Sequence, residues 1–154
     1  MKEIERKFLV RDLSFKVGVE GVLYRQGYIS QTKESVVRVR IAGDEGYLTI
    51  KTKTIGITRN EFEYKIPLED AKQLLDSVCE KPLIEKVRYM VSDQGNTWEV
   101  DEFLGDNEGL IIAEIELENE HQEIAKPSWI GDEVSHDPRY YNSNLVKNPF
   151  KYWS

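Results

Sequence analysis

Apolar and polar residues alternate along most of this chain, which is the pattern of β-strands with one apolar and one polar face. Stretches of this kind follow one another and are separated by turn residues, as in Gly43–Gly46. The eight expected strands span Glu3–Val10, Val22–Gln31, Ser35–Ala42, Tyr47–Thr54, Thr58–Ile66, Ile84–Ser92, Asn96–Leu104 and Leu110–Glu118. Consecutive strands joined by short hairpins predict a closed or nearly closed antiparallel barrel.

Helical spacing of apolar residues is found at fewer places. The clearest helix opens at Pro67, which suits a first helical turn, and its apolar residues recur at helical intervals as far as Val78. A second helix is expected over Glu118–Lys126, and a short third helix begins near Asp137. The pattern therefore predicts a β-dominated α+β fold, an eight-stranded antiparallel barrel with a few flanking helices, in one domain over residues 1–154.

The polar face of the predicted strands is almost wholly ionised. Residues two positions apart share a face of a strand, and here they form pairs of like charge, such as Glu3 with Glu5. The other pairs are Arg38 with Arg40, Lys51 with Lys53, Glu61 with Glu63, Lys86 with Arg88, Glu99 with Asp101, and Glu114 with Glu116. Like charges at this spacing destabilise a bare sheet surface. A polyanion for the basic pairs and divalent cations for the acidic pairs would supply the missing counter-charges.

Two arrangements of this face are open. If it points into the barrel, the interior is a polar tunnel with acidic and basic walls, and helices or a second subunit must cover the apolar outer face. A homodimer is expected where the helices leave that face uncovered. The alternative is a solvated sheet face over an ordinary core.

Composition narrows the classes of partner and metal. The formal net charge is −7 and the pI is about 5.0, which argues against general binding to nucleic acid or to anionic membranes. Cys79 is the single cysteine and there are two histidines, so a metal here would be hard and bound by oxygen ligands. The sequence has no apolar run near eighteen residues and no signal-like amino terminus. We therefore expect a soluble, cytoplasmic protein.

The residues Glu3-Ile4-Glu5-Arg6-Lys7 fit E-x-E-x-K, the amino-terminal signature of the CYTH family, the triphosphate tunnel metalloenzymes. Further segments resemble the family's small bacterial members: Gln26–Ile29, Val37–Arg40, Leu48–Lys51, Arg59–Glu63, Glu85–Tyr89, Trp98–Asp101, Gly109–Leu117, Trp129–Val134 and Arg139–Ser143. The resemblance spans nearly the whole chain. It departs at Ser135, where a threonine would be expected, and this position is expected to touch no site residue.

The resemblance implies an eight-stranded tunnel that binds a triphosphate chain together with Mg²⁺ or Mn²⁺. Members hydrolyse inorganic tripolyphosphate, thiamine triphosphate or nucleoside triphosphates, and some are class IV adenylyl cyclases. The match to short, single-domain bacterial proteins favours an inorganic tripolyphosphatase that yields pyrophosphate and orthophosphate. A class IV adenylyl cyclase, a thiamine triphosphatase and a non-catalytic polyphosphate- or nucleotide-binding module are the alternatives.

The ionised face supplies a hypothesis for each role. The expected metal ligands are Glu3, Glu5, Asp101, Glu114 and Glu116. The expected phosphate-binding residues are Lys7, Arg38, Arg40, Lys51, Lys53 and Arg88, with Lys86 beside them. Tyr28 and Lys86 are the candidate catalytic residues. Tyr28 either accepts a proton, which needs nearby cations to lower the pKa of its phenol, or simply forms a hydrogen bond. Glu61 and Glu63 either bind a second metal through water or hold the lysines in place.

Overall fold

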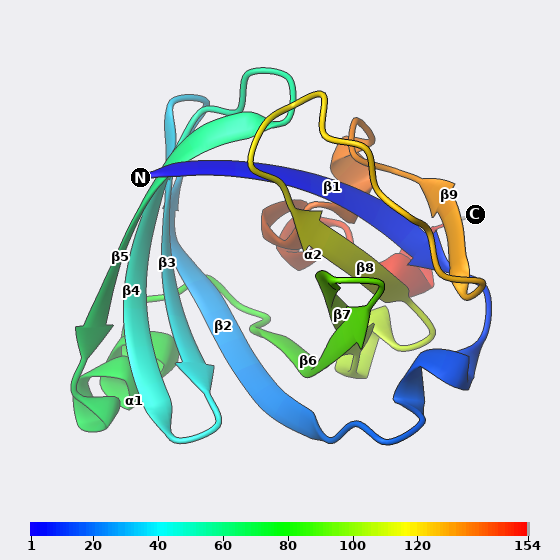
Figure 1. Ribbon diagram of the computed structural model, residues 1–154. Helices are drawn as coiled ribbons and strands as arrows, with labels where there is room; N and C mark the ends of the chain where they lie inside the picture. The colour runs from blue at the N-terminus through cyan, green and yellow to red at the C-terminus, as the bar shows by residue number, and fades with distance from the viewer. Residues whose placement is uncertain (154) are drawn as a thin grey trace.

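The computed structural model describes residues 1–153 and shows a closed antiparallel barrel (Figure 1). Its strands are β1 (Lys2–Val10), β2 (Gly21–Gln31), β3 (Ser35–Ala42), β4 (Glu45–Thr52), β5 (Thr58–Ile66), β6 (Ile84–Asp93), β7 (Asn96–Phe103), β8 (Ile111–Glu116) and β9 (Ile130–Glu133). The strand order is β5-β4-β3-β2-β6-β7-β8-β1, and pairing of β1 with β5 closes the ring. The predicted eight-stranded barrel is confirmed. The sequence did not predict β9, which pairs with the end of β1.

The helices lie at two different places on the barrel. Figure 1 shows α1 (Leu68–Ser77) outside the ring beside β3 and β4, and α2 (Asn142–Lys147) close to the carboxyl-terminal segment. Short 3-10 turns complete the chain: η1 (Leu13–Lys16), η2 (Gly105–Asn107), η3 (Pro138–Tyr140) and η4 (Phe150–Tyr152). The first and third predicted helices are thus confirmed. Within residues 1–153, no helix is long and apolar enough to cross a membrane.

The helix predicted over Glu118–Lys126 is wrong. This segment contains turns and irregular backbone, and the backbone N–H of Glu118 donates to the side chain of Gln122. Its residues favour a helix individually, but they offer no apolar stripe to bury, and a short helix without one gains little from packing. Only Ile124 packs against the neighbouring core.

The apolar faces of the strands point out of the barrel and are covered in large part by the chain itself. Phe8 and Trp98 are fully buried, with ring centroids 5.6 Å apart in an edge-to-face arrangement. Phe15 of η1 and Trp129, which precedes β9, cover them from outside. On the other side, Leu75 of α1 and its neighbours bury the outer faces of β3 and β4. This burial is the main favourable term in holding the ring together.

One end of the barrel interior is apolar rather than charged. Ile84, Phe103 and Ile112 follow the same alternation as the charged inward-facing residues, but they are almost fully buried. Leu145 and Val146 of α2 pack against them. The helix α2 therefore closes this end, and the charged part of the interior is a tunnel with one blocked mouth.

Candidate active site

The charged faces of the strands enclose a cavity of about 270 Å³ inside the barrel. Its ionisable and phenolic lining residues are Glu3, Glu5, Lys7, Tyr28, Arg38, Arg40, Lys51, Arg59, Glu61, Glu63, Lys86, Arg88, Glu99, Glu114, Glu116 and Tyr141. Every member of the charged pairs lines this cavity except Lys53 and Asp101, and Asp101 is buried behind Lys86 and Arg88. The interior brings acids and bases from seven strands to one space.

Glu5 and Glu114 form an acidic pair across β1 and β8, where Glu5 faces Glu116 and Lys7 faces Glu114 in register. Burial and the charge of Glu114 raise the pKa of Glu5 well above its ordinary value, and this favours a protonated Glu5 that forms a hydrogen bond with Glu114. Glu114 is buried too, but the charge of Lys7, whose Nζ lies 3.7 Å from Oε1, keeps its pKa low. The two carboxyl groups thus share one proton, and a divalent cation bound between them would displace that proton.

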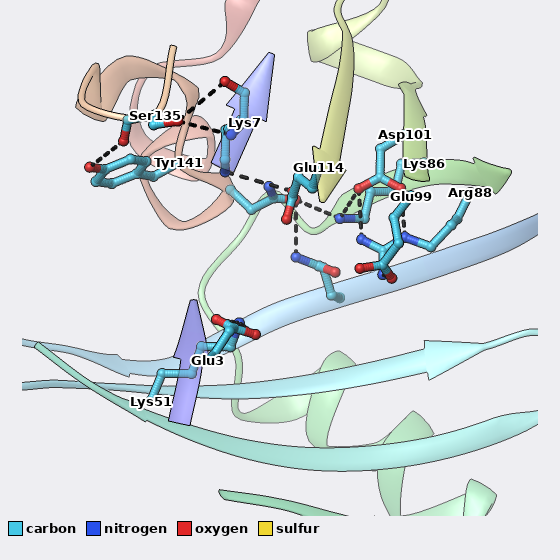
Figure 2. Close-up of polar contacts among 12 residues, drawn as sticks. Glu3, Lys7, Lys51, Lys86, Arg88, Glu99, Asp101, Glu114, Ser135 and Tyr141 are labelled. Atoms are coloured by element: carbon cyan, nitrogen blue, oxygen red, sulfur yellow. Dashed lines mark hydrogen bonds and ion pairs between the residues drawn. The ribbon is translucent and has the colours of Figure 1, made fainter. Parts of the chain in front are cut away.

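Glu3 is the centre of a second cluster near the closure of β1 against β5. Its Oε1 lies 3.1 Å from Lys51 Nζ and 3.1 Å from Arg59 Nε. Burial opposes its ionisation, but a hydrogen bond from Glu61 and the charges of Lys51 and Arg59 lower its pKa to about 2. Burial and the same hydrogen bond raise the pKa of Glu61 to about 7. Figure 2 shows Glu3 and Lys51 side by side on neighbouring walls of the cavity.

Lys86, Arg88 and Asp101 form a buried triad on β6 and β7 (Figure 2). Asp101 Oδ2 lies 2.8 Å from Lys86 Nζ, and Arg88 donates from Nε and Nη2 to both Asp101 oxygens at 2.7 and 2.8 Å. Burial lowers the pKa of Lys86 to about 7, although Asp101 stabilises its charged form, and Arg88 and Arg40 repel that charge. Lys86 is therefore a lysine that can lose its proton near neutral pH.

Arg38 and Arg40 of β3 present donors to the same cavity. Arg38 Nη2 donates to Thr49 Oγ1 at 3.2 Å, while its buried Nε has no acceptor among the described residues. Arg40 Nε donates to Gln26 Oε1 at 3.1 Å. Burial and the charge of Arg38 lower the pKa of Arg40 to about 10. Arg38 has one distant carboxylate partner, Glu63 at 3.9 Å, and buried guanidinium groups with donors to spare are suited to a bound anion.

Tyr28 of β2 lies deep in the cavity, almost fully buried beside α2. Gln26 Nε2 donates to Tyr28 Oη at 3.1 Å and to Asn142 Oδ1 at 3.3 Å. Asn142 Oδ1 also accepts from Lys86 Nζ at 2.8 Å. The first residue of α2 thus joins the two candidate catalytic residues in one hydrogen-bond network.

Three positions differ from the sequence-based expectation. Lys53 is exposed and does not line the cavity, because β4 ends at Thr52 and the alternation ends with it. Asp101 was expected to face the cavity as a metal ligand, but it is 0% exposed and both its oxygens serve Lys86 and Arg88. Ser135 does touch the site: it lines the cavity, and its Oγ accepts from the backbone N–H of Lys7 at 3.0 Å.

Several lining residues were not assigned a role from the sequence, among them Arg59, Glu99 and Asn142. Arg59 has the same parity as Glu61 and Glu63, so extending the alternation by two residues would have identified it. Asn142 had no comparable signal, because its position depends on α2 entering the barrel end. Its neighbours Tyr141 and Ser143 line the cavity as well.

The acidic residues suit a hard divalent cation by their chemistry, since carboxylate oxygens are the ligands that Mg²⁺ and Mn²⁺ prefer. Among residues 1–153, no three acidic, histidine or cysteine side chains converge closely enough to form a ready-made metal centre. The carboxylates lie instead in the pairs Glu5–Glu114 and Glu3–Glu61, each held by a hydrogen bond. These pairs fit a cation that displaces a shared proton or a neighbouring ammonium group.

The fold and the cavity together define an antiparallel tunnel protein whose ionised interior is built for a highly charged ligand. The CYTH domain model matches residues 1–141, and the chain belongs to the CYTH family. An inorganic triphosphatase from Acetivibrio thermocellus is 59% identical over 150 residues, which covers 97% of this chain and 96% of the relative. One from Nitrosomonas europaea is 36% identical over 151 residues, covering 95% and 97%.

A solved structure of the inorganic triphosphatase NE1496 is also similar to this chain. It superimposes with a TM-score of 0.69 at 33% identity, over 94% of this chain and 93% of that one. The likeness therefore extends over the barrel, the strands that carry the charged pairs and most of the carboxyl-terminal segment.

Proposed function

We propose that this protein is a metal-dependent inorganic triphosphatase that hydrolyses tripolyphosphate to pyrophosphate and orthophosphate. The observation that carries this function is the closed cavity in which paired carboxylates on β1 and β8 lie with arginines and lysines from β3, β4 and β6. Such a cavity matches a polyanion that arrives with a divalent cation. Two relatives that align with nearly the whole chain are named inorganic triphosphatase, which supports the same activity here.

The blocked end of the barrel favours a bare phosphate chain over a nucleotide. Leu145 and Val146 fill the space next to Tyr28, and Asn142 contacts Lys86 directly. A base or thiazolium group attached to the triphosphate would have to remain at the open side of the cavity. This arrangement supports inorganic tripolyphosphate over ATP or thiamine triphosphate as the preferred substrate.

CYTH triphosphatases are metal-dependent, and we propose that Glu3, Glu5, Glu114 and Glu116 hold Mg²⁺ or Mn²⁺ here. When bound, the cation neutralises charge on the phosphate chain and makes a coordinated water more acidic. Glu116 is exposed near Glu3, and partial burial of its carboxyl group together with the charge of Glu3 raises its pKa. A cation between these carboxylates would relieve that repulsion. We assign Asp101 a different role, as the counter-ion that holds Lys86 and Arg88 in place.

The basic side chains bind and orient the phosphates. Arg38 and Arg40 offer planar donor forks to phosphoryl oxygens, and Arg88 adds the charge of a guanidinium whose fork is bound to Asp101. Lys7 and Lys51 add point charges from β1 and β4. Glu61 lies 3.8 Å from Lys51, and Glu63 lies 3.9 Å from Arg38. These contacts support a role for Glu61 and Glu63 in holding the basic residues rather than in binding a second metal.

Lys86 takes the proton in the hydrolytic step. Because its pKa is about 7, it is largely neutral in mildly alkaline solution and can accept a proton from the water that attacks the terminal phosphorus. The new oxygen–phosphorus bond forms in line with the bond that breaks, and pyrophosphate leaves with the electron pair. Asn142 and Asp101 hold the Lys86 ammonium that results, and Tyr28 forms a hydrogen bond in the same network.

The experiment that tests this function compares orthophosphate release from tripolyphosphate, ATP, thiamine triphosphate and pyrophosphate side by side. Each substrate is incubated with Mg²⁺, with Mn²⁺ and with EDTA at several pH values, and cyclic nucleotide is assayed in the ATP reactions. We expect fast, metal-dependent release from tripolyphosphate and much slower release from the others. Cyclic AMP with pyrophosphate as the main products from ATP would indicate a cyclase. Tight binding without release would indicate a non-catalytic module.

We also propose that the protein acts in the cytoplasm and forms a homodimer. Phe62 and Tyr64 are 44% and 57% exposed on the outer face of β5, which α1 does not fully cover. Light scattering after gel filtration gives the oligomeric state, and cell fractionation gives the compartment.

A further inference from the structure

Arg59 lies at the seam where the barrel closes. It is the register partner of Glu3 in the short antiparallel pairing of β1 with β5. Its Nε donates to Glu3 Oε1 at 3.1 Å, and its side chain lines the cavity. The Arg59 side chain is 28% exposed, compared with 12% for Glu3, so the guanidinium covers the carboxylate on its open side.

The hydrogen-bonding capacity of Arg59 is largely unused. A guanidinium carries five N–H donors, and within residues 1–153 only Nε has a hydrogen-bond acceptor. The Arg59 side chain borders the cavity, as do those of Arg38 and Arg40. Arg59 can therefore donate to a ligand through its Nη groups without breaking any other contact within the protein.

Glu3 serves both Arg59 and Lys51 in this structure. The same carboxylate belongs to the set proposed to hold the divalent cation. A cation that takes Glu3 as a ligand competes with the Arg59 and Lys51 contacts, because Lys51 Nζ contacts both Glu3 oxygens, at 3.1 and 3.3 Å, and Arg59 Nε contacts Oε1. The two basic side chains would then face the cavity without their carboxylate partner.

We infer that Arg59 is a further phosphate-binding residue, and that its ion pair with Glu3 is exchanged when the cation and the phosphate chain bind. The cation takes over Glu3, and the released Arg59 binds phosphate oxygens. This inference rests on the proposed function, because it takes a triphosphate with a divalent cation as the ligand of the cavity. It adds Arg59 to the proposed phosphate-binding residues, and it couples binding of the cation to binding of the phosphate chain.

The exchange predicts opposite effects of one substitution on the two ligands. Arg59→Ala removes the guanidinium group that competes with the metal for Glu3, so the metal alone should bind more tightly. The same change removes a phosphate donor, so tripolyphosphate without metal should bind more weakly. A simple loss of local structure would weaken both.

The experiment is isothermal titration calorimetry of the purified full chain with two separate probes. One titration uses Mn²⁺ alone, and the other uses tripolyphosphate in the presence of EDTA. The variants are Arg59→Ala, Arg59→Gln and Arg59→Lys, with Lys53→Ala as the matched control that removes a nearby basic side chain outside the cavity. Arg59→Gln retains much of the side-chain volume, so it serves if the alanine variant fails to fold.

For Arg59→Ala and Arg59→Gln, we expect tripolyphosphate binding about tenfold weaker, as for the loss of one charge-assisted hydrogen bond, and Mn²⁺ binding a few-fold tighter. Arg59→Lys should recover most of the phosphate affinity, and Lys53→Ala should match the wild type for both probes. Unchanged tripolyphosphate affinity, or weaker binding of both ligands, would overturn the inference. If the wild-type chain neither bound nor hydrolysed tripolyphosphate, the proposed function itself would fail. If only the Arg59 variants departed from expectation, the proposed function would stand without this inference.

Discussion

Lys86 Nζ lies 2.8 Å from Asp101 Oδ2, and both side chains are 1% exposed. Asp101 also accepts two hydrogen bonds from Arg88, so one buried carboxylate serves two cations. Burial opposes its ionisation, but Lys86 and Arg88 lower the pKa of Asp101 to about 2. Lys86 and Arg88 of the basic wall therefore share one buried anion, and Arg88 has a second carboxylate partner in Glu99 at 2.7 Å.

Asp101→Asn is expected to destabilise the fold strongly, because it leaves the buried Lys86 without its carboxylate partner and Arg88 with Glu99 alone. Removing one partner of a buried ion pair typically costs about 3–5 kcal/mol. Urea denaturation at pH 7.5 measures this free energy of unfolding. A loss below about 1 kcal/mol, within the range of an exposed ion pair, would show that Asp101 does not have this role.

The contribution of Asp101 also has a predicted pH dependence. Its pKa is lowered from 3.8 in the unfolded chain to about 2 in the fold. The stabilisation is therefore fully present well above pH 3.8 and is lost as the pH falls toward 2. The difference in free energy of unfolding between the wild type and Asp101→Asn should narrow over this interval. A constant difference across it would contradict the assignment.

The pH dependence of hydrolysis should report Lys86. Its pKa of about 7 predicts that kcat rises as the pH passes through 7 and then levels off, because the neutral amine is the form that accepts the proton. Lys86→Arg keeps the positive charge but cannot lose its proton at these pH values. This variant should lower kcat by roughly 100-fold or more, within the usual range for general-base catalysis. A variant with wild-type kcat and an unchanged pH profile would exclude Lys86 as the base.

Glu116→Ala should remove much of the metal dependence of the reaction. We expect the apparent affinity for Mn²⁺ to fall and kcat/KM at fixed metal concentration to fall by roughly 100-fold. The matched control is Glu45→Ala, which removes an exposed carboxylate that pairs with Lys65 and does not line the cavity. If the Glu116 and Glu45 variants behaved alike in a metal titration, the proposed ligand set would be wrong.

The helix α2 is expected to close one end of the barrel by packing into it. Leu145 is 0% exposed among Ile84, Phe103 and Ile112. Leu145→Ala is expected to cost about 2–5 kcal/mol of stability, as for other large-to-small changes in a packed core. The ratio of ATP to tripolyphosphate hydrolysis should also rise as the blocked end loosens. A loss of stability well below this range would show that α2 is not packed into the barrel.

The alternation of charge was sufficient to predict the barrel and most of the site, because two-residue periodicity is a direct consequence of strand geometry. It identified Glu3, Glu114 and Arg38 on the inner face without any knowledge of their contacts. The alternation fails where a strand ends, which explains the error at Lys53. It also cannot tell a side chain at the cavity surface from one behind it, as Asp101 shows.

Other parts of the site depend on packing between segments far apart in the sequence. Asn142 reaches Lys86 only because Leu145 and Val146 fill the apolar end of the barrel. Ser135 reaches the backbone of Lys7 because β9 pairs with the end of β1 and brings residue 135 alongside. Neither contact has a local sequence signal. Arg59 is an intermediate case, since its parity was visible but its partner Glu3 was not.

The most direct test of the central claim is the product ratio from tripolyphosphate, followed by ³¹P NMR in the presence of Mg²⁺. If the tunnel holds one tripolyphosphate chain and water attacks its terminal phosphorus, orthophosphate and pyrophosphate should form in equal amounts. The pyrophosphate should persist, and EDTA should stop the reaction. Consumption that does not depend on the metal, or conversion of tripolyphosphate to orthophosphate alone, would contradict the account.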